Sequence, residues 1–164
     1  MARYLITLHT YGSWLADRKE GWTDRRKSGT MRTSHELGDW QRAAMSKPEE
    51  ALTHPRQRLA IAAAEEAAAR RDFALYTVGS WLTHLHALVG VVDARDPGLI
   101  RRALKRSISH TLSDRAGVGL PFLSGGGGIT RVSGRKKFEF FRELYLPDHP
   151  GWLFDSRTGL RPPS

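Results

Sequence analysis

The chain has 164 residues and carries 26 Lys and Arg against 17 Asp and Glu, which gives a net charge of +9 at pH 7. This length suits a single domain over residues 1–164, and the charge indicates a polyanionic partner, nucleic acid before a membrane surface, unless it serves solubility alone. The lack of cysteine excludes disulfides and thiolate chemistry and fits a reducing cytoplasm. No apolar run reaches the roughly 18 residues of a membrane span. Together these features predict a cytoplasmic protein without a membrane partner.

The first predicted elements are a strand at 4–11 and a long basic loop at 12–55. Apolar and polar side chains alternate along the strand, which places His9 on the face opposite Ile6 and Leu8. The loop lacks periodicity, apart from a short helical turn expected at 36–45. Loops of this length in compact domains are usually functional.

Two tryptophans and several basic residues lie close together in this loop. Trp14 and Trp22 stand near Arg25 and Arg26, a combination that suits base stacking over phosphate contacts. Aromatic residues that pin the loop to the body of the domain are an equal alternative.

A helix at 56–71 and a hairpin of two strands, 73–78 and 81–92, are predicted next. Pro55 is well placed in the first turn of the helix, whose apolar stripe is rich in alanine. A Gly-Ser pair separates the two strands, which favours the hairpin.

Two histidines lie one residue apart in the second strand of this hairpin. His84 and His86 therefore share one face with Leu88, while Leu85 and Ala87 point into a core on the other side. Two imidazoles held in this way can bind one divalent cation. An isolated His-x-His is more often an ordinary strand whose histidines lie in the core or face water, so other features must support a metal site.

A second helix is predicted at 97–115, followed by a glycine-rich linker at 117–128 and an edge strand at 129–132. The outer side of the helix is basic and includes Arg101 and Lys105, which suits phosphate contacts, although a solvated helix face explains it equally well. Four consecutive glycines in the linker predict a flexible connector, and no P-loop pattern surrounds them.

The C-terminal part begins with basic residues at 135–137 and continues in an amphipathic helix predicted at 138–146. This helix carries Tyr145, and His149 follows four residues later. The polar tail at 156–164 contains two prolines and is expected to be flexible.

The order of elements predicts the fold class. The chain runs β, α, β, β, α and then adds a strand and a helix, which favours an α+β fold with a central antiparallel sheet of RRM-like, ferredoxin-like character and helices on one face. The other face would carry the two histidines.

Several motifs occur together in a fixed order. They are the opening residues 4–7 and 10–15, the segment 21–26, His84-Leu85-His86, Leu104-Lys105 in the following helix, and the C-terminal Tyr145. In this combination most of the chain resembles the HUH single-tyrosine transposases of small insertion sequences and their REP-associated relatives. His-x-His alone is weak, whereas the ordered combination is specific.

The resemblance implies a site and its chemistry. Tyr145 would attack a DNA phosphodiester and form a 5′-phosphotyrosine link with release of a 3′-OH. His84, His86 and a third ligand about one helical turn beyond the tyrosine would bind Mg²⁺ or Mn²⁺, and His149 stands at that place.

Two residues depart from the family's pattern. The family often has Gln at the position of His149, on an unbroken helix, whereas here Pro147 lies between Tyr145 and His149 and disfavours a continuous helix. His149 as an ordinary loop histidine is therefore an open alternative. In that case Asp148 and a water would be the substitute ligands. Thr83 stands where many relatives have Asn, which would alter a supporting contact to the first histidine. The competing tyrosines are Tyr4, Tyr11 and Tyr76.

The function implied by the resemblance is a metal-dependent single-stranded DNA endonuclease and strand transferase in transposition or recombination. Its substrate would be single-stranded or hairpin DNA, and a homodimer is a further expectation. The alternatives are a non-catalytic nucleic-acid-binding module on the same fold and a replication-initiator or relaxase-type nickase. The candidate DNA contacts are Trp14, Trp22, Arg25, Arg26, Arg101, Lys105, Arg131, Arg135, Lys136 and Lys137.

Overall fold

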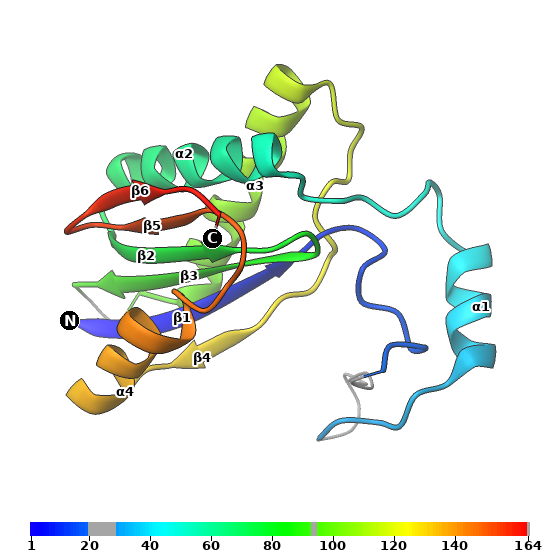
Figure 1. Cartoon of the computed structure of the whole chain (residues 1–164), viewed down its shortest axis with the longest axis horizontal. Coiled ribbons are helices and arrows are strands. Elements are labelled where there is room, and N and C mark those ends of the chain that lie inside the picture. Colours follow the sequence, from blue (N-terminus) through cyan, green and yellow to red (C-terminus); the bar gives the residue numbers. More distant parts are fainter. Residues whose placement is uncertain (20–28, 93–94, 164) are drawn as a thin grey trace.

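The computed structural model describes residues 1–19, 29–92 and 95–163. It contains a six-stranded antiparallel sheet with the strand order β4-β1-β3-β2-β5-β6 (Figure 1). This confirms the predicted α+β class with a central antiparallel sheet. The strands are β1 (Ala2–His9), β2 (Ala74–Ser80), β3 (His84–Val91), β4 (Ile129–Arg131), β5 (Leu153–Asp155) and β6 (Gly159–Arg161).

Two long helices, α2 (His54–Arg71) and α3 (Pro97–Ala116), cover one face of the sheet (Figure 1). Each has a proline in its first turn. Backbone N–H groups there have no hydrogen-bond partner within the helix, so the proline costs no helical hydrogen bond. At the start of α3, the carboxylate of Asp96 accepts a hydrogen bond of 2.8 Å from the N–H of Gly98. Among the described residues, no helix is long and apolar enough to cross a membrane.

The alternation in β1 and β3 sorts side chains between the two faces of the sheet, as predicted, but each face carries a core where only one was expected. Ile6 and Leu85 are buried in a large core under α2 and α3. Leu5 and Leu88 face the opposite side and form a smaller core with Leu146. Because a slip of one residue would exchange the two faces, this apolar pattern fixes the register of the strands.

The C-terminal helical segment lies over the smaller core, on the face opposite α2 and α3. The prediction that all helices lie on one face is therefore wrong for this segment. It consists of α4 (Arg135–Glu139) and a π-helical turn, η1 (Phe140–Tyr145). Phe138 and Phe141 pack against the smaller core, whose apolar surface would otherwise face water. The segment therefore covers the face that carries the histidines.

The predicted linker at 117–128 contains no helix and only an isolated bridge, but it is held against β1. The N–H of Ser124 donates to the carbonyl of His9 (2.9 Å), and Thr7 and Gly128 exchange two backbone hydrogen bonds (2.9 and 3.1 Å). A Cβ on Gly127 would lie 2.5 Å from the carbonyl oxygen of Thr7, so only glycine allows this approach. After β4, residues 132–134 alone join the sheet to α4.

The predicted loop at 12–55, whose last two residues begin α2, contains the helix α1 (His35–Ala43), near the turn expected at 36–45. The hydroxyl of Ser34 caps it by accepting from the N–H of Leu37 (3.3 Å). The helix lies away from the sheet (Figure 1). Three predicted DNA contacts in this loop lie outside the described residues: Trp22, Arg25 and Arg26.

The tail at 156–164, predicted to be flexible, instead completes the sheet. β5 pairs with β2, and β6 pairs with β5 in a hairpin. Asp155 fixes the turn of this hairpin, since one of its carboxylate oxygens accepts a bond of 2.8 Å from the N–H of Arg157. Neither β5 nor β6 shows an alternation of apolar and polar residues, so the sequence did not reveal these two strands.

Candidate metal centre beside a tyrosine

β3 presents two imidazoles on the face of the sheet that carries the smaller core. His84 begins the strand and His86 follows two residues later, with ring centroids 4.9 Å apart. The antiparallel register sets His9 of β1 opposite His84 and Thr7 opposite His86. The predicted pairing of His84 and His86 on one face therefore holds.

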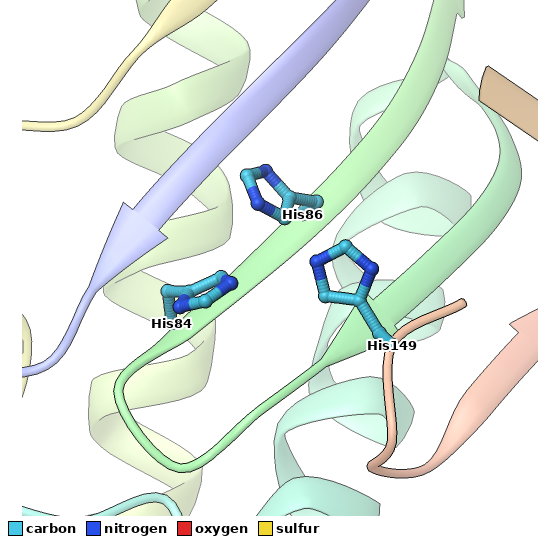
Figure 2. Close-up of side chains that lie close together, drawn as sticks. All are labelled: His84, His86 and His149. Carbon is cyan, nitrogen blue, oxygen red and sulfur yellow. The ribbon is translucent and has the colours of Figure 1, made fainter. Parts of the chain in front are cut away.

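The third imidazole comes from the turn that follows η1. The ring centroid of His149 lies 5.5 Å from that of His84 and 5.0 Å from that of His86. One ring nitrogen from each of the three residues lies within 4.8 Å of the other two. Figure 2 shows the three rings gathered over β3, with His149 reaching in from the C-terminal segment. Three nitrogen donors at this separation can surround one ion.

Pro147 does not keep His149 from the other two histidines. After η1 the chain turns tightly, and the N–H of His149 donates to the carbonyl of Leu146 (3.2 Å). Gly79 of β2 lies under this turn, where a Cβ would be 3.0 Å from the carbonyl oxygen of Leu146 and 3.4 Å from Cγ of His149. The glycine leaves room for the turn, so an unbroken helix is not needed to bring His149 to the pair.

Each of the three histidines has an oxygen within hydrogen-bond distance of its Nδ1. For His149 this oxygen is a backbone carbonyl, which only accepts, so Nδ1 carries a proton and Nε2 is the nitrogen available to a metal ion. Bonds of this kind orient imidazoles that bind metals. The contacts join His149 to the carbonyl of Tyr145 (3.0 Å), His86 to the hydroxyl of Thr7 (2.8 Å) and His84 to the hydroxyl of Thr83 (3.0 Å). Thr83 thus still supplies a supporting oxygen.

Burial favours the neutral form of the two strand histidines. Desolvation, with smaller electrostatic contributions from His149, His9 and Arg18, lowers the pKa of His84 to about 4. Desolvation and repulsion from His84 likewise lower the pKa of His86 to about 3. Both imidazoles are therefore neutral at pH 7, which is the form that binds a metal ion.

Tyr145 is the tyrosine that lies beside the three imidazoles. Its hydroxyl oxygen is 3.3 Å from Nε2 of His86, and its ring centroid is 5.2 Å from that of His149. Partial burial raises the pKa of the phenol. The other tyrosines have different contacts: the hydroxyl of Tyr11 meets Ser46, that of Tyr76 donates to the sulfur of Met1, and Tyr4 packs against the larger core.

A buried ion pair holds the segment that carries this tyrosine, and sequence reasoning missed it. Nε and Nη2 of Arg142, in η1, each donate a bond of 2.9 Å to the carboxylate of Asp155 in β5. The two side chains are only 10% and 9% exposed. Burial acts to raise the pKa of Asp155, but hydrogen bonds from Arg142 and Arg157 outweigh it and hold that pKa below its usual range.

His9 and Trp14 border the site on the side of β1. The ring centroid of His9 is 6.1 Å from that of His84 and 4.3 Å from that of Trp14. The guanidinium of Arg18 lies 4.2 Å above the Trp14 ring. Nδ1 of His9 is buried with no hydrogen-bond partner within the described part of the chain, and desolvation lowers the pKa of His9 to about 4. The strand alternation predicted the face on which His9 lies, and the pairing of β1 with β3 brings that face to the site.

The two predicted DNA contacts of α3 face the glycine-rich segment. Arg101 donates to the carbonyl of Gly127 (2.8 Å), and Lys105 donates to the carbonyls of Ser124 and Gly126, the latter at 2.9 Å. Both side chains therefore hold 117–128 in place. The remaining predicted contacts in this part of the chain are exposed on β4 and α4: Arg131, Arg135, Lys136 and Lys137.

The sequence matches no protein-family model and none of the curated proteins. Among solved structures, the fold is similar to that of a REP-associated tyrosine transposase bound to a REP hairpin, with a TM-score of 0.56 and 11% sequence identity. The match covers 91% of this chain and 66% of that chain, so this chain spans just under two thirds of its length. The likeness establishes the fold, an antiparallel α+β domain of the kind that this transposase has.

Proposed function

We propose that the chain is a metal-dependent single-stranded DNA endonuclease and strand transferase whose nucleophile is Tyr145. The observation that carries the proposal is the gathering of three imidazoles, from His84, His86 and His149, beside the Tyr145 hydroxyl. Imidazoles next to a phenol suit metal-assisted phosphoryl transfer. The net charge of +9 and the fold shared with a transposase support DNA as the substrate.

The donor set fits a divalent cation. His84, His86 and His149 each offer one nitrogen, and three protein ligands leave positions open for phosphate or water oxygens. Imidazole ligands suit Mn²⁺ better than Mg²⁺, because Mg²⁺ prefers oxygen ligands in a strict octahedron. When bound, such an ion supplies Lewis-acid polarisation of the scissile phosphate.

In the proposed reaction, Tyr145 forms a new bond to the phosphorus atom in place of the DNA bond that breaks. Its phenolic oxygen bonds to phosphorus, the bond from phosphorus to the 3′ oxygen breaks, and the proton that the phenol loses is balanced by the one that the 3′ oxygen takes up. The resulting 5′-phosphotyrosine is itself a phosphodiester, so rejoining needs no external energy source. The ion pair of Arg142 with Asp155 holds the tyrosine segment for this attack.

A covalent adduct is the direct test. Purified protein is mixed with single-stranded hairpin oligonucleotides and Mn²⁺ or Mg²⁺, and the adduct is detected as a shifted band under denaturing conditions. Tyr145→Phe should abolish it and keep DNA binding, whereas Tyr11→Phe, a matched change away from the histidines, should leave it unchanged. No adduct on any oligonucleotide would contradict the proposal, and chelator-insensitive DNA binding without an adduct would indicate a non-catalytic binding module.

A further inference from the structure

The π-helical turn adds Phe140 to the side chains beside Tyr145, which also include Phe141 at 5.5 Å between ring centroids. The N–H of Leu146 donates to the carbonyl of Phe141 (3.0 Å), a bond across five residues. In an α-helix, residues five apart point about 140° away from each other. The wider π turn brings Phe140 next to Tyr145, with ring centroids 6.2 Å apart and an angle of 30° between the rings. The two rings form a stacked pair at the edge of the site.

A shallow hollow lies beside this pair. Its volume is about 530 Å³, and Tyr145 itself forms part of its wall. Phe140 and Leu144, also in the wall, are 48% and 65% exposed, although burying such side chains is favourable. The full lining is Phe140, Glu143, Leu144, Tyr145, Pro147 and Asp148. An exposed apolar surface that continues from a candidate nucleophile indicates a ligand.

The chemistry of the attack indicates which part of the DNA lies here. The nucleotide that keeps the 5′ phosphate stays bonded to the Tyr145 oxygen after cleavage, so its sugar and base must lie within one nucleotide of that oxygen. The hollow is lined by Tyr145 together with the apolar side chains of Phe140, Leu144 and Pro147. Its carboxylates, Glu143 and Asp148, would repel a phosphate, whereas an unpaired base can stack on an aromatic ring.

We propose that Phe140 is the stacking platform for the unpaired base of the nucleotide whose 5′ phosphate is transferred to Tyr145. This inference rests on the proposed function, because it takes Tyr145 as the nucleophile. The π turn has a role in this arrangement, since it sets the Phe140 ring beside the Tyr145 ring. The ligand is a nucleobase without its pairing partner, so the site selects single-stranded DNA at the cleaved bond.

The first experiment reads stacking without cleavage. A fluorescent adenine analogue, 2-aminopurine, is placed in turn at each position of a single-stranded oligonucleotide, and its quenching on binding is recorded. Wild-type protein and Phe140→Trp should quench one position at least twice as strongly as Phe140→Ala. Trp40→Ala, which removes an exposed aromatic side chain (67%) on the distant α1, is the control and should behave as wild type. Equal quenching by Phe140→Ala at every position would overturn the inference.

The second experiment measures adduct formation with and without the base. Phe140→Ala should slow the adduct about tenfold on the intact oligonucleotide, as expected for the loss of one stacked base. When the nucleotide after the cleaved bond is abasic, wild type and Phe140→Ala should react within about twofold of each other. The same loss on both substrates would show a merely structural role for Phe140 and overturn the inference.

The two failures are distinguishable. If wild-type protein forms no adduct while quenching depends on Phe140, the proposed function fails, and so does the assignment of the base to the transferred nucleotide. If wild type forms the adduct and neither measurement depends on Phe140, the inference fails and the proposed function stands.

Discussion

Nδ1 of His86 lies 2.8 Å from the hydroxyl oxygen of Thr7, its direct partner on the neighbouring strand. Thr7, in β1, thus orients the imidazole of His86, a candidate metal ligand in β3, although β1 contributes none of the three candidate ligands. An imidazole oriented in this way presents Nε2 toward the other two histidines and toward Tyr145.

Thr7→Val should weaken metal binding. The change keeps the shape of the side chain and removes the hydroxyl, so the dissociation constant for Mn²⁺ should rise about 10- to 100-fold. Titration calorimetry measures it, and Thr7→Ser, which keeps the hydroxyl, should bind within about twofold of wild type. Unchanged affinity in Thr7→Val would show that the contact does not support the site.

The donor set leads to a preference between ions. Adduct formation should be faster with Mn²⁺ than with Mg²⁺ at equal concentration, because three imidazole nitrogens suit Mn²⁺ better. Rates measured under single-turnover conditions decide this, and His149→Ala should lower the affinity for Mn²⁺. A protein that reacts with Mg²⁺ alone would point to oxygen ligands in place of His149.

Acid should destabilise the metal-free protein through the two strand histidines. An unfolded histidine binds its proton near pH 6.5, whereas His84 and His86 do so only near pH 4 and pH 3. The unfolded state therefore binds more protons as the pH falls below about 6.5, and the free energy of unfolding decreases by up to about 1.4 kcal/mol per histidine and pH unit. Denaturation in the presence of chelator between pH 7 and 4 measures this slope.

A matched variant identifies the source of this slope. The double change His84→Asn with His86→Asn removes both titrating groups and should flatten the pH dependence of unfolding. A slope equal to that of the wild type would assign the acid sensitivity to other groups.

Asp155→Asn should destabilise the fold strongly. It leaves the buried guanidinium of Arg142 without its carboxylate, which costs about 3–5 kcal/mol in comparable buried pairs. Urea denaturation measures the change in the free energy of unfolding. Arg157→Ala removes the more exposed partner of the same carboxylate and should cost much less, because solvent screens an exposed ion pair. Equal losses in the two variants would contradict a special role for Arg142.

Patterns of short range in the sequence predicted much of the fold. The alternation around His84 and His86 fixed both the strand and its two faces, since the side-chain period of a strand is two. Prolines in the first turns marked the starts of α2 and α3. The same alternation predicted the face of His9, although only the pairing of β1 with β3 brings it to the site.

Contacts between segments that are far apart in the chain could not be predicted from the sequence. Arg142 and Asp155 are thirteen residues apart, and no spacing rule joins them, because one lies in a helical turn and the other in a strand beyond a tight turn. Arg101 and Lys105 have the exposed helical spacing of phosphate contacts, yet they bind backbone carbonyls of the glycine-rich segment. Pro147 suggested that His149 would not reach the other two histidines, since proline interrupts helical spacing. The tight turn that passes over Gly79 brings His149 there instead, and helical spacing does not predict such a turn.

The short connection between β4 and α4 bears on stoichiometry. Residues 132–134 span it, and the N–H of Val132 is bound to the carbonyl of Arg3 (2.9 Å) at the start of β1. The segment with Tyr145 is thus attached closely to the same copy of the chain that provides His84 and His86. Complementation should therefore fail: a mixture of His84→Ala and Tyr145→Phe proteins should yield no adduct, and the wild-type rate should be proportional to protein concentration. One polypeptide would suffice for each cleavage.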